Sequence, residues 1–236
     1  MGGRPTLENI FAEQHETLNH HNCEIPLLKA MLAHSATWGE AGERLKAILK
    51  TQYDGHRLRK LVANWLGYGV PDINKVLHCN QQRATLIGFG ELLDGGAHIY
   101  NLPLPPSLSA KRVKRKLTIT LAWISPIAAN TQKYRVANLW FDAPNSESIA
   151  SERVDVHSGN VRKGTLQHEI FEGEKANPFL DGDVMKIKIN CLNDAAKIQN
   201  PIAYGLFVSL EVAENIDISI YNEISNKIKM RAEIKV

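Results

Sequence analysis

The spacing of the hydrophobic residues changes near Cys79, and this change constrains the fold more than any other feature of the sequence. Before it, apolar residues recur every third or fourth position, which is the spacing of one face of an α-helix. After it they alternate with polar residues, which is the spacing of half-buried β-strands. The sequence therefore predicts a helical segment over residues 1–78 and an all-β segment over residues 79–236.

Three helices are predicted in the first segment. The first begins near Ile25, with Pro26 in the first turn, where proline is favoured, and continues to about Ala36. It is apolar on almost every side, so we expect it to be buried. A second helix follows over residues 45–52. The third carries a regular apolar stripe: Leu58, Leu61, Val62, Trp65 and Leu66.

A Gly-Tyr-Gly turn at residues 67–69 is expected to end the third helix, because glycine tolerates the positive φ angles of helix ends. Pro71 and Asp72 are then expected to begin a further short helix. Its inner face would hold Ile73, Val76 and Leu77.

Three stretches of the second segment alternate most clearly: LTITLAW at 117–123, VMKIKIN at 184–190 and LFVSLEV at 206–212. In the first of them, Thr118 and Thr120 lie on the face opposite the apolar residues, and we expect all three stretches to be half-buried antiparallel strands. Weaker candidate strands cover residues 85–92, 98–102, 136–141, 165–171, 215–220 and 227–236. About eight or nine short strands separated by turns predict an antiparallel β-sandwich or jelly roll. The fold class is therefore mainly β.

Charge and composition exclude several classes of protein. The 236 residues include 28 Lys and Arg against 25 Asp and Glu, so overall charge gives no reason to expect a nucleic-acid partner. No apolar run approaches the ~18 residues of a membrane helix, and no secretion signal is visible, so we expect a cytoplasmic protein without a membrane partner. The three cysteines, Cys23, Cys79 and Cys191, are widely spaced and form no CxxC motif, which favours reduced thiols.

Two stretches, PLLKAMLAHSATW and LGYGVPDINKVL, resemble the end of a subtilisin-like serine peptidase domain. There they correspond to the helix after the nucleophile helix, and to the G-Y-G-x-x-D turn with the closing helix. The stretches ATLIGFGEL, YNLPLPPSLS, KRKLTITLAWISPI, YRVANLWFD, GTLQHEIFEGE and PIAYGLFVSLEVAE resemble the β-sandwich that follows the catalytic domain in one group of bacterial subtilases. The resemblance extends from about residue 20 to the end of the chain.

This resemblance implies that residues 1–78 are the closing segment of a subtilisin-like catalytic domain and that residues 79–236 are its C-terminal β-sandwich. It implies proteolysis by a full-length protein, with the upstream catalytic domain and peptide or protein substrates as partners. An AAA-type ATPase is a further partner that the resemblance suggests. The sandwich would stabilise the catalytic domain or present a substrate.

The catalytic blocks of the family are missing from this sequence. Subtilases carry their Ser in G-T-S-x-x-x-P, their His in H-G-T and their Asp in D-[ST]-G, all upstream of the first helix. A serine peptidase needs all three groups and oxyanion donors in one constellation. We therefore predict no catalytic residue, no cofactor-binding residue and no metal ligand, and we expect the chain alone to be inactive.

Two stretches imitate catalytic motifs. GTLQH, from Gly164 to His168, has Leu166 where the nucleophile block needs Ser, and it lies in a predicted strand. His34 and Ser35 are adjacent in a helix, where neighbouring side chains point about 100° apart. We expect His34 and Ser35 to be a buried, locally hydrogen-bonded pair.

Potential metal and carbohydrate sites have structural alternatives. His15, His20, His21 and Cys23 are competent zinc ligands, but their spacing matches no standard closed site, so a solvated surface is expected. Asp181 and Asp183 flank a glycine and suggest either calcium or, more simply, a hairpin turn. Trp123 and Trp140 could form a platform for a sugar, although tryptophan on a sandwich strand is usually part of the core.

The densest basic run, from Lys111 to Lys116, could contact phosphate or an acidic surface. The simpler interpretation is a charged approach to the strand that begins at Leu117, where it would discourage edge pairing.

Two functional hypotheses follow. The first is the C-terminal fragment of a subtilisin-like endopeptidase, and the alternative is a stand-alone β-sandwich binding module with no link to proteolysis. If the first is right, the lost neighbours should uncover some of the apolar residues Leu28, Met31, Leu32, Leu61 and Trp65. The uncovered area should then fold back on the sandwich, associate with another chain or become disordered.

Overall fold

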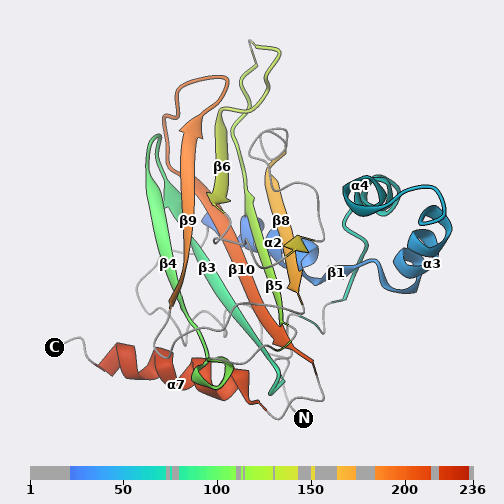
Figure 1. Ribbon diagram of the computed structural model, residues 1–236. Coiled ribbons are helices and arrows are strands. Elements are labelled where there is room, and N and C mark those ends of the chain that lie inside the picture. Colours follow the sequence, from blue (N-terminus) through green and yellow to red (C-terminus); the bar gives the residue numbers. More distant parts are fainter. Residues whose placement is uncertain are drawn as a thin grey trace, which may run out of the picture.

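The computed structural model describes residues 22–72, 75, 80–109, 113, 115–129, 131–142, 150–151, 164–173, 184–213 and 218–233. Five strands form one antiparallel sheet in the order β3 (Arg83–Leu92), β10 (Ile202–Val212), β5 (Arg115–Trp123), β8 (Leu166–Gly173), β7 (Ala150–Ser151). Three strands form a second antiparallel sheet in the order β4 (Ala97–Pro103), β9 (Val184–Asn193), β6 (Ala137–Asp142). The two sheets face each other (Figure 1), so the predicted antiparallel β-sandwich is confirmed.

The main core lies between the two sheets. The inner face of β5 supplies Leu117, Ile119, Leu121 and Trp123, none of which is more than 3% exposed. They pack against side chains of the other sheet, namely Leu139, Phe141, Ile187, Ile189 and Cys191. Trp123 is therefore a core residue and cannot stack on a sugar.

The first and third predicted helices are confirmed as α2 (Glu24–Ser35) and α4 (Gly55–Leu66). The second, expected over residues 45–52, is α3 (Gly39–Leu49), which begins six residues earlier and ends at Leu49. The turn after α4 uses positive φ angles at Gly67 and Gly69, as expected. At Gly69 a Cβ atom would lie 2.3 Å from the carbonyl oxygen of Thr37, so no other residue fits. The close approach of Gly69 to Thr37 lets β1 (Ala36–Thr37) pair with β2 (Val70–Pro71), so that each strand of this small sheet has two residues.

The helix expected to begin at Pro71 does not begin there. Pro71 lies in β2 opposite Ala36, because the chain pairs with β1 before it turns again. Lys75 is helical, and its N–H donates to the carbonyl oxygen of Asp72 at 3.0 Å. Ile73, Val76 and Leu77 lie outside the described residues.

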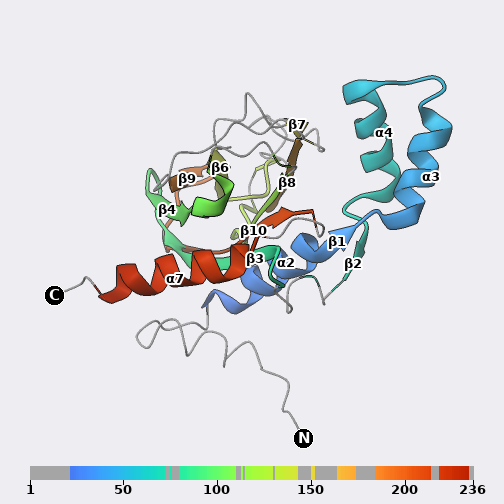
Figure 2. The ribbon, with the colours of Figure 1, turned by 60° about the horizontal axis from the view of Figure 1, so that its bottom comes forward.

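Helix α2 covers the outer face of the five-stranded sheet, over β5 and β10 (Figure 2). A second apolar cluster forms there, in which Leu27 and Met31 of α2 pack near Ala122 and Phe207 of the sheet. The expectation that β5 is half-buried is therefore wrong: Thr118 and Thr120 are 7% and 0% exposed. It is wrong for β10 too, where Ser209 is 2% exposed, but it is confirmed for β9, where Lys186 and Lys188 are exposed. Alternation predicted that this face of β5 and β10 is polar, but not that a helix covers it.

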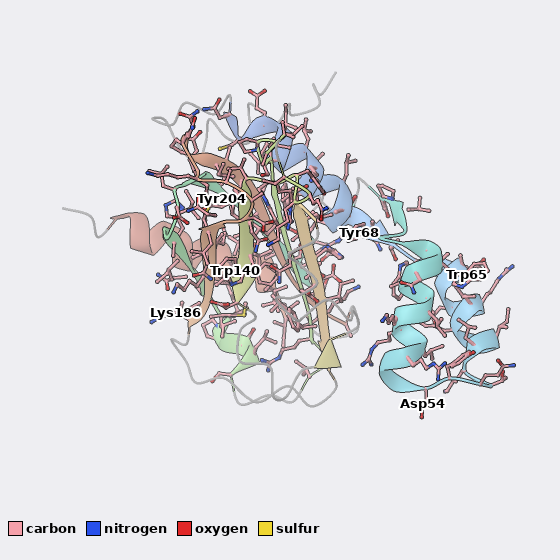
Figure 3. All side chains as sticks on the ribbon, turned by 90° about the horizontal axis from the view of Figure 1, so that it is seen from above. Asp54, Trp65, Tyr68, Trp140, Lys186 and Tyr204 are labelled. Atoms are coloured by element: carbon pink, nitrogen blue, oxygen red, sulfur yellow. The ribbon has the colours of Figure 1, made fainter. Side chains whose placement is uncertain are left out.

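The prediction that α2 is buried on all sides is also wrong. Its face toward the sheet is buried, but Ile25, Leu28 and Leu32 on the other side are 65%, 41% and 50% exposed. Helices α3 and α4 form a hairpin that projects beside the sandwich (Figure 1), and Figure 3 places Trp65 on it, clear of the sandwich. Trp65 is 75% exposed.

Of the strands expected at 215–220 and 227–236, Ile220 and residues 227–233 instead belong to helix α7 (Ile220–Glu233), which lies at the foot of the sandwich in Figure 1. Residues 215–217 and 234–236 lie outside the described ranges. Ile220 and Ile224 are one helical turn apart and both are buried. They close the end of the sandwich together with Leu108, in the short helix η2 (Pro106–Leu108), and with Leu210. The segment is helical because this i, i+4 pair is buried, although apolar and polar residues alternate later in it.

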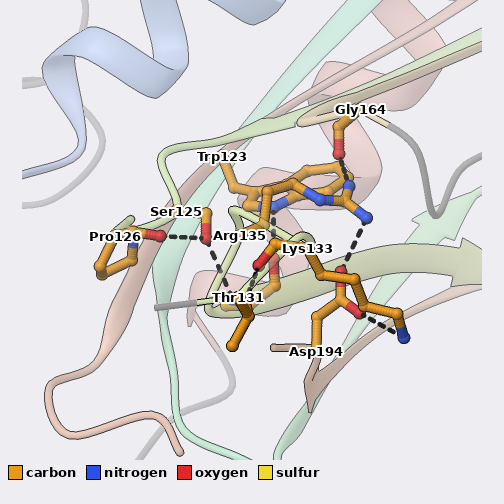
Figure 4. Close-up of polar contacts among 9 residues, drawn as sticks. Trp123, Ser125, Pro126, Thr131, Lys133, Arg135, Gly164 and Asp194 are labelled. Atoms are coloured by element: carbon orange, nitrogen blue, oxygen red, sulfur yellow. Dashed lines mark hydrogen bonds and ion pairs between the residues drawn. The ribbon is translucent and has the colours of Figure 1, made fainter. Parts of the chain in front are cut away.

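A buried arginine holds the long connection between β5 and β6 (Figure 4). The Arg135 side chain is 5% exposed, and its Nη2 lies 2.9 Å from Oδ2 of Asp194, while Nη1 donates to the carbonyl oxygen of Gly164. Lys133 approaches the same carboxylate at 3.5 Å. The cluster joins this connection to the start of β8 and the turn after β9, so its role is structural.

None of the helices in the described ranges combines the length and apolar character needed to cross a membrane.

Candidate functional site

A cavity of about 550 Å³ lies where the helical segment meets the sandwich. One wall comes from the end of α2, from β1 and from the start of α3, and the other from β3, β5 and β10. Tyr68, in the turn after α4, also lines it, and Figure 3 shows this residue at the junction. The cavity therefore depends on the docking of the helical segment against the sheet.

His34 lines this cavity and joins its two walls. Its Nδ1 lies 2.8 Å from Oγ1 of Thr120 on β5, and its Nε2 lies 2.7 Å from Oγ of Ser209 on β10. The network continues on both sides, since Ser209 contacts Thr85 and Thr120 contacts His168 Nδ1, each at 2.7 Å. Five polar side chains thus form one hydrogen-bonded network between α2 and the sheet.

The expected local pair of His34 and Ser35 is only half confirmed. The Ser35 hydroxyl does donate locally, to the carbonyl oxygen of Leu32 at 3.0 Å. His34 instead binds residues that are 86 and 175 positions away in the sequence. The last turn of α2 points His34 at the sheet, where the hydroxyls of two strands are in reach.

Burial lowers the pKa of His34 to about 3, and the nearby charges of Arg83 and Lys116 act in the same direction. The imidazole is therefore neutral near pH 7. A neutral imidazole has one donor and one acceptor nitrogen, so one of its two hydroxyl partners accepts a hydrogen bond and the other donates one.

The Ser209–His34 contact has the distance of a nucleophile and its base, but its environment opposes catalysis. The second imidazole nitrogen faces the Thr120 hydroxyl, whereas a catalytic triad places a carboxylate there. A histidine with a pKa of about 3 is a poor base near pH 7, and Ser209 is only 2% exposed. We interpret the pair as a structural link between α2 and the sheet.

Sequence reasoning missed this network because its members are far apart in the chain. The only local signal was a polar position within a strongly apolar strand, at Thr120 and at Ser209. Such a position predicts a solvated face equally well.

Several sequence-predicted sites lie outside the described residues, including His15, His20, His21, Asp181 and Asp183. Cys23 is described and buried; its Sγ lies 3.7 Å from the carbonyl oxygen of Gly90, and burial raises the pKa of its thiol. Within the described ranges no three His, Cys, Asp or Glu side chains are grouped so that they could hold a metal ion. Trp140 packs against the edge of the main core, and its Nε1 donates to Oδ1 of Asp142 at 3.3 Å.

The basic run does not protect an edge strand. Its last two residues, Arg115 and Lys116, already belong to β5, which pairs with β10 on one side and β8 on the other. Arg115 is 3% exposed and donates to the carbonyl oxygen of Leu108 at 2.8 Å, whereas Lys116 lines the cavity. Leu166, in the GTLQH stretch, begins β8 and packs against the cluster under α2, in the strand setting that was predicted.

No protein-family model matches this chain, and no curated protein matches it. Residues and geometry alone therefore carry the functional argument.

Proposed function

We propose that this chain is the C-terminal part of a subtilisin-like serine endopeptidase. In this proposal residues 1–78 close the catalytic domain, and the β-sandwich of residues 79–236 stabilises that domain or binds a substrate or partner. Proteolysis belongs to the full-length protein, because the Asp, His and Ser of the triad are supplied upstream. The proposal places the protein in the cytoplasm, with peptide or protein substrates and an AAA-type ATPase as partners.

The observation that carries this proposal is the uncovered face of α2. Ile25, Leu28 and Leu32 recur at i, i+3 and i+7, so they share one side of the helix, and all three are exposed. The opposite side, with Leu27 and Met31, is buried on the sheet. A helix that is apolar on both sides is typical of an element packed between two layers. A catalytic domain of the resembled family would supply the second layer.

The hairpin adds to this support. Trp65 is exposed, as the loss of neighbouring elements would require, and Leu61 is only half-buried. Met31 is covered because α2 is docked on the sandwich, which is one of the three outcomes expected for uncovered apolar area. Within the described part of the helical segment, these apolar faces are therefore not covered by other helices.

A stand-alone β-sandwich binding module is the second candidate. The cavity between the helical segment and the sheet favours it, because about 550 Å³ is within the usual size of a ligand site.

The two candidates differ in what the gene encodes upstream of Met1. The first expects the Asp, His and Ser blocks of a subtilase, in that order and in frame. A protein that includes them should react with a fluorophosphonate probe, and the chain alone should not, because Ser209 is buried beside a histidine that is a poor base. Labelling of Ser209 in the chain alone, or an upstream sequence without these blocks, would refute the proposal.

Leu28 provides a direct structural test. In the chain alone, Leu28→Ala should reduce binding of a dye specific for apolar surface and leave unfolding almost unchanged. In the longer protein the same substitution should lower the free energy of unfolding by about 2–4 kcal/mol, because Leu28 would be covered. Ile127→Ala is the matched control, since Ile127 is 77% exposed on the sandwich and should be silent in both proteins. If Leu28→Ala is equally silent in the longer protein, no layer covers α2.

A further inference from the structure

The cavity beside His34 carries an excess of positive charge. Among the described residues that line it, four are cationic (Lys46, Lys75, Arg83 and Lys116) and two are anionic (Glu43 and Glu211), so the formal charge of the lining is +2. The neutral imidazole of His34 adds nothing to this charge.

Two of the four cations have partners. Lys46 lies 3.1 Å from Glu43, and Arg83 lies 2.8 Å from Glu211. Lys75 and Lys116 make no ion pair with any residue in the described part of the chain. Both are half-buried, so they lose part of their hydration. Lys116 has Glu211 of β10 and Glu172 of β8 as its register partners, and Glu211 is engaged by Arg83. An anion bound in the cavity would offset the positive charges of Lys75 and Lys116.

The start of α3 adds a second feature that favours an anion. Gly39, the first residue of this helix, lines the cavity, and no side chain caps the helix from the N-cap position at Trp38. The Gly39 N–H donates to Oγ1 of Thr37 at 3.3 Å, and the positive end of the helix dipole attracts further negative charge. Glu40, the acidic residue of this first turn, is engaged by Arg44 at 3.2 Å.

The remaining walls offer neutral polar groups and aromatic surface. Thr37 and Thr118 bring hydroxyls, and Asn80 brings an amide. Trp38 and Tyr68 line the same space, and Trp38 is fixed by a hydrogen bond from its Nε1 to the carbonyl oxygen of Gly67 at 3.0 Å. The cavity therefore has charged groups for an oxyanion and flat surface for the body of a larger molecule.

We propose that this cavity is a binding site for a small oxyanion, a phosphate or carboxylate group held by Lys75, Lys116 and the start of α3. The site is independent of the peptidase proposal, because it needs only the docked helical segment and the sheet.

The test is a titration of the ¹⁵N-labelled chain with sodium phosphate and, separately, with sodium acetate, at an ionic strength held constant with sodium chloride. Saturable shifts of amide signals are expected at Thr37, Gly39 and Thr118. Lys116→Gln and Lys75→Gln should each weaken the affinity about fivefold or more, because each removes one charge from the site. Lys186→Gln should not, since Lys186 is exposed on β9, away from the junction (Figure 3).

Amide shifts with phosphate alone would assign a phosphate-bearing ligand, and shifts with acetate alone would assign a carboxylate. Shifts with both ions would support a site that binds either group. The absence of saturable shifts with either ion overturns the proposal, and so does an equal loss of affinity in Lys186→Gln. The amide spectrum of each variant reports its folding. If Lys116→Gln fails to fold, Lys75→Gln decides, because Lys75 lies outside the sheets.

Discussion

At β5 and β10 both faces of the five-stranded sheet are buried, but they are stabilised by different interactions. On the inner face, Leu121 and its apolar neighbours pack against the other sheet. On the outer face, α2 covers a mixture of apolar residues and the hydroxyls of Thr120 and Ser209, which His34 joins. Burial of apolar area is not directional, whereas the hydrogen bonds of the outer face require each partner at one position.

This difference shows why one helix can be held on a polar sheet face. Each hydroxyl under α2 would cost free energy if it were buried without a partner, and the imidazole supplies partners on both sides. Substitutions on the inner face should therefore lower stability mainly through lost side-chain volume. On the outer face, stability should depend on how closely α2 packs against the sheet and on the protonation of His34.

The largest expected effect belongs to the inner face. Leu121→Ala removes buried volume at a side chain that is 0% exposed, so it should lower the free energy of unfolding by about 3–5 kcal/mol. Urea denaturation followed by circular dichroism measures it. Ile127→Ala should stay within about 0.5 kcal/mol of the native chain. A loss below about 1 kcal/mol for Leu121→Ala would mean that the inner face is not the main core.

Gly205→Ala should disturb only the outer face. A Cβ atom at this residue of β10 would lie 2.7 Å from Cα of Leu27, so the backbone of α2 has to move. We expect a cost of about 2 kcal/mol, typical of overpacking, and faster amide hydrogen exchange in α2 than in β5. Gly164→Ala is the control, because its Cβ would meet nothing closer than 3.9 Å. Uniform acceleration across the sandwich would show that α2 does not open independently.

The smallest expected effect is a dependence of stability on pH through His34. Its pKa is about 3 in the folded chain and about 6.5 when unfolded, so the unfolded state binds more protons between these values. This contribution is complete above pH 6.5 and is lost as the pH falls. Between about pH 7.5 and about pH 5.5 the loss should be about 1.4 kcal/mol.

The comparison of the native chain with His34→Gln isolates this contribution. Glutamine does not titrate, so the variant should be less stable near pH 7.5 but should lose about 1.4 kcal/mol less on acidification. Arg83, Lys116 and His168 face the same network and are present in both proteins. Equal slopes in the two proteins would mean that His34 is not buried in its neutral form.

Local pattern was sufficient for most of the secondary structure. The apolar stripe of α4, the glycines that end it and the alternation in β5, β9 and β10 are properties of short stretches, and each element was found close to its predicted position. Helix α7 was missed because its tail also alternates. Its helical form is seen in the burial of Ile220 and Ile224 against the end of the sandwich.

The candidate site could not be predicted in the same way. A threonine such as Thr120 on the polar face of a strand has the same local pattern whether water or a helix covers it, so the sequence determined the face but not its cover. The tertiary structure decided that α2 docks there. It also brought His34 to Thr120 and Ser209, and it enclosed the cavity with Lys75 and Lys116 in its lining. The physical reason is range: helix and strand periodicity are set by neighbours along the chain, whereas hydrogen bonds and cavities between layers are set by which residues pack together in space.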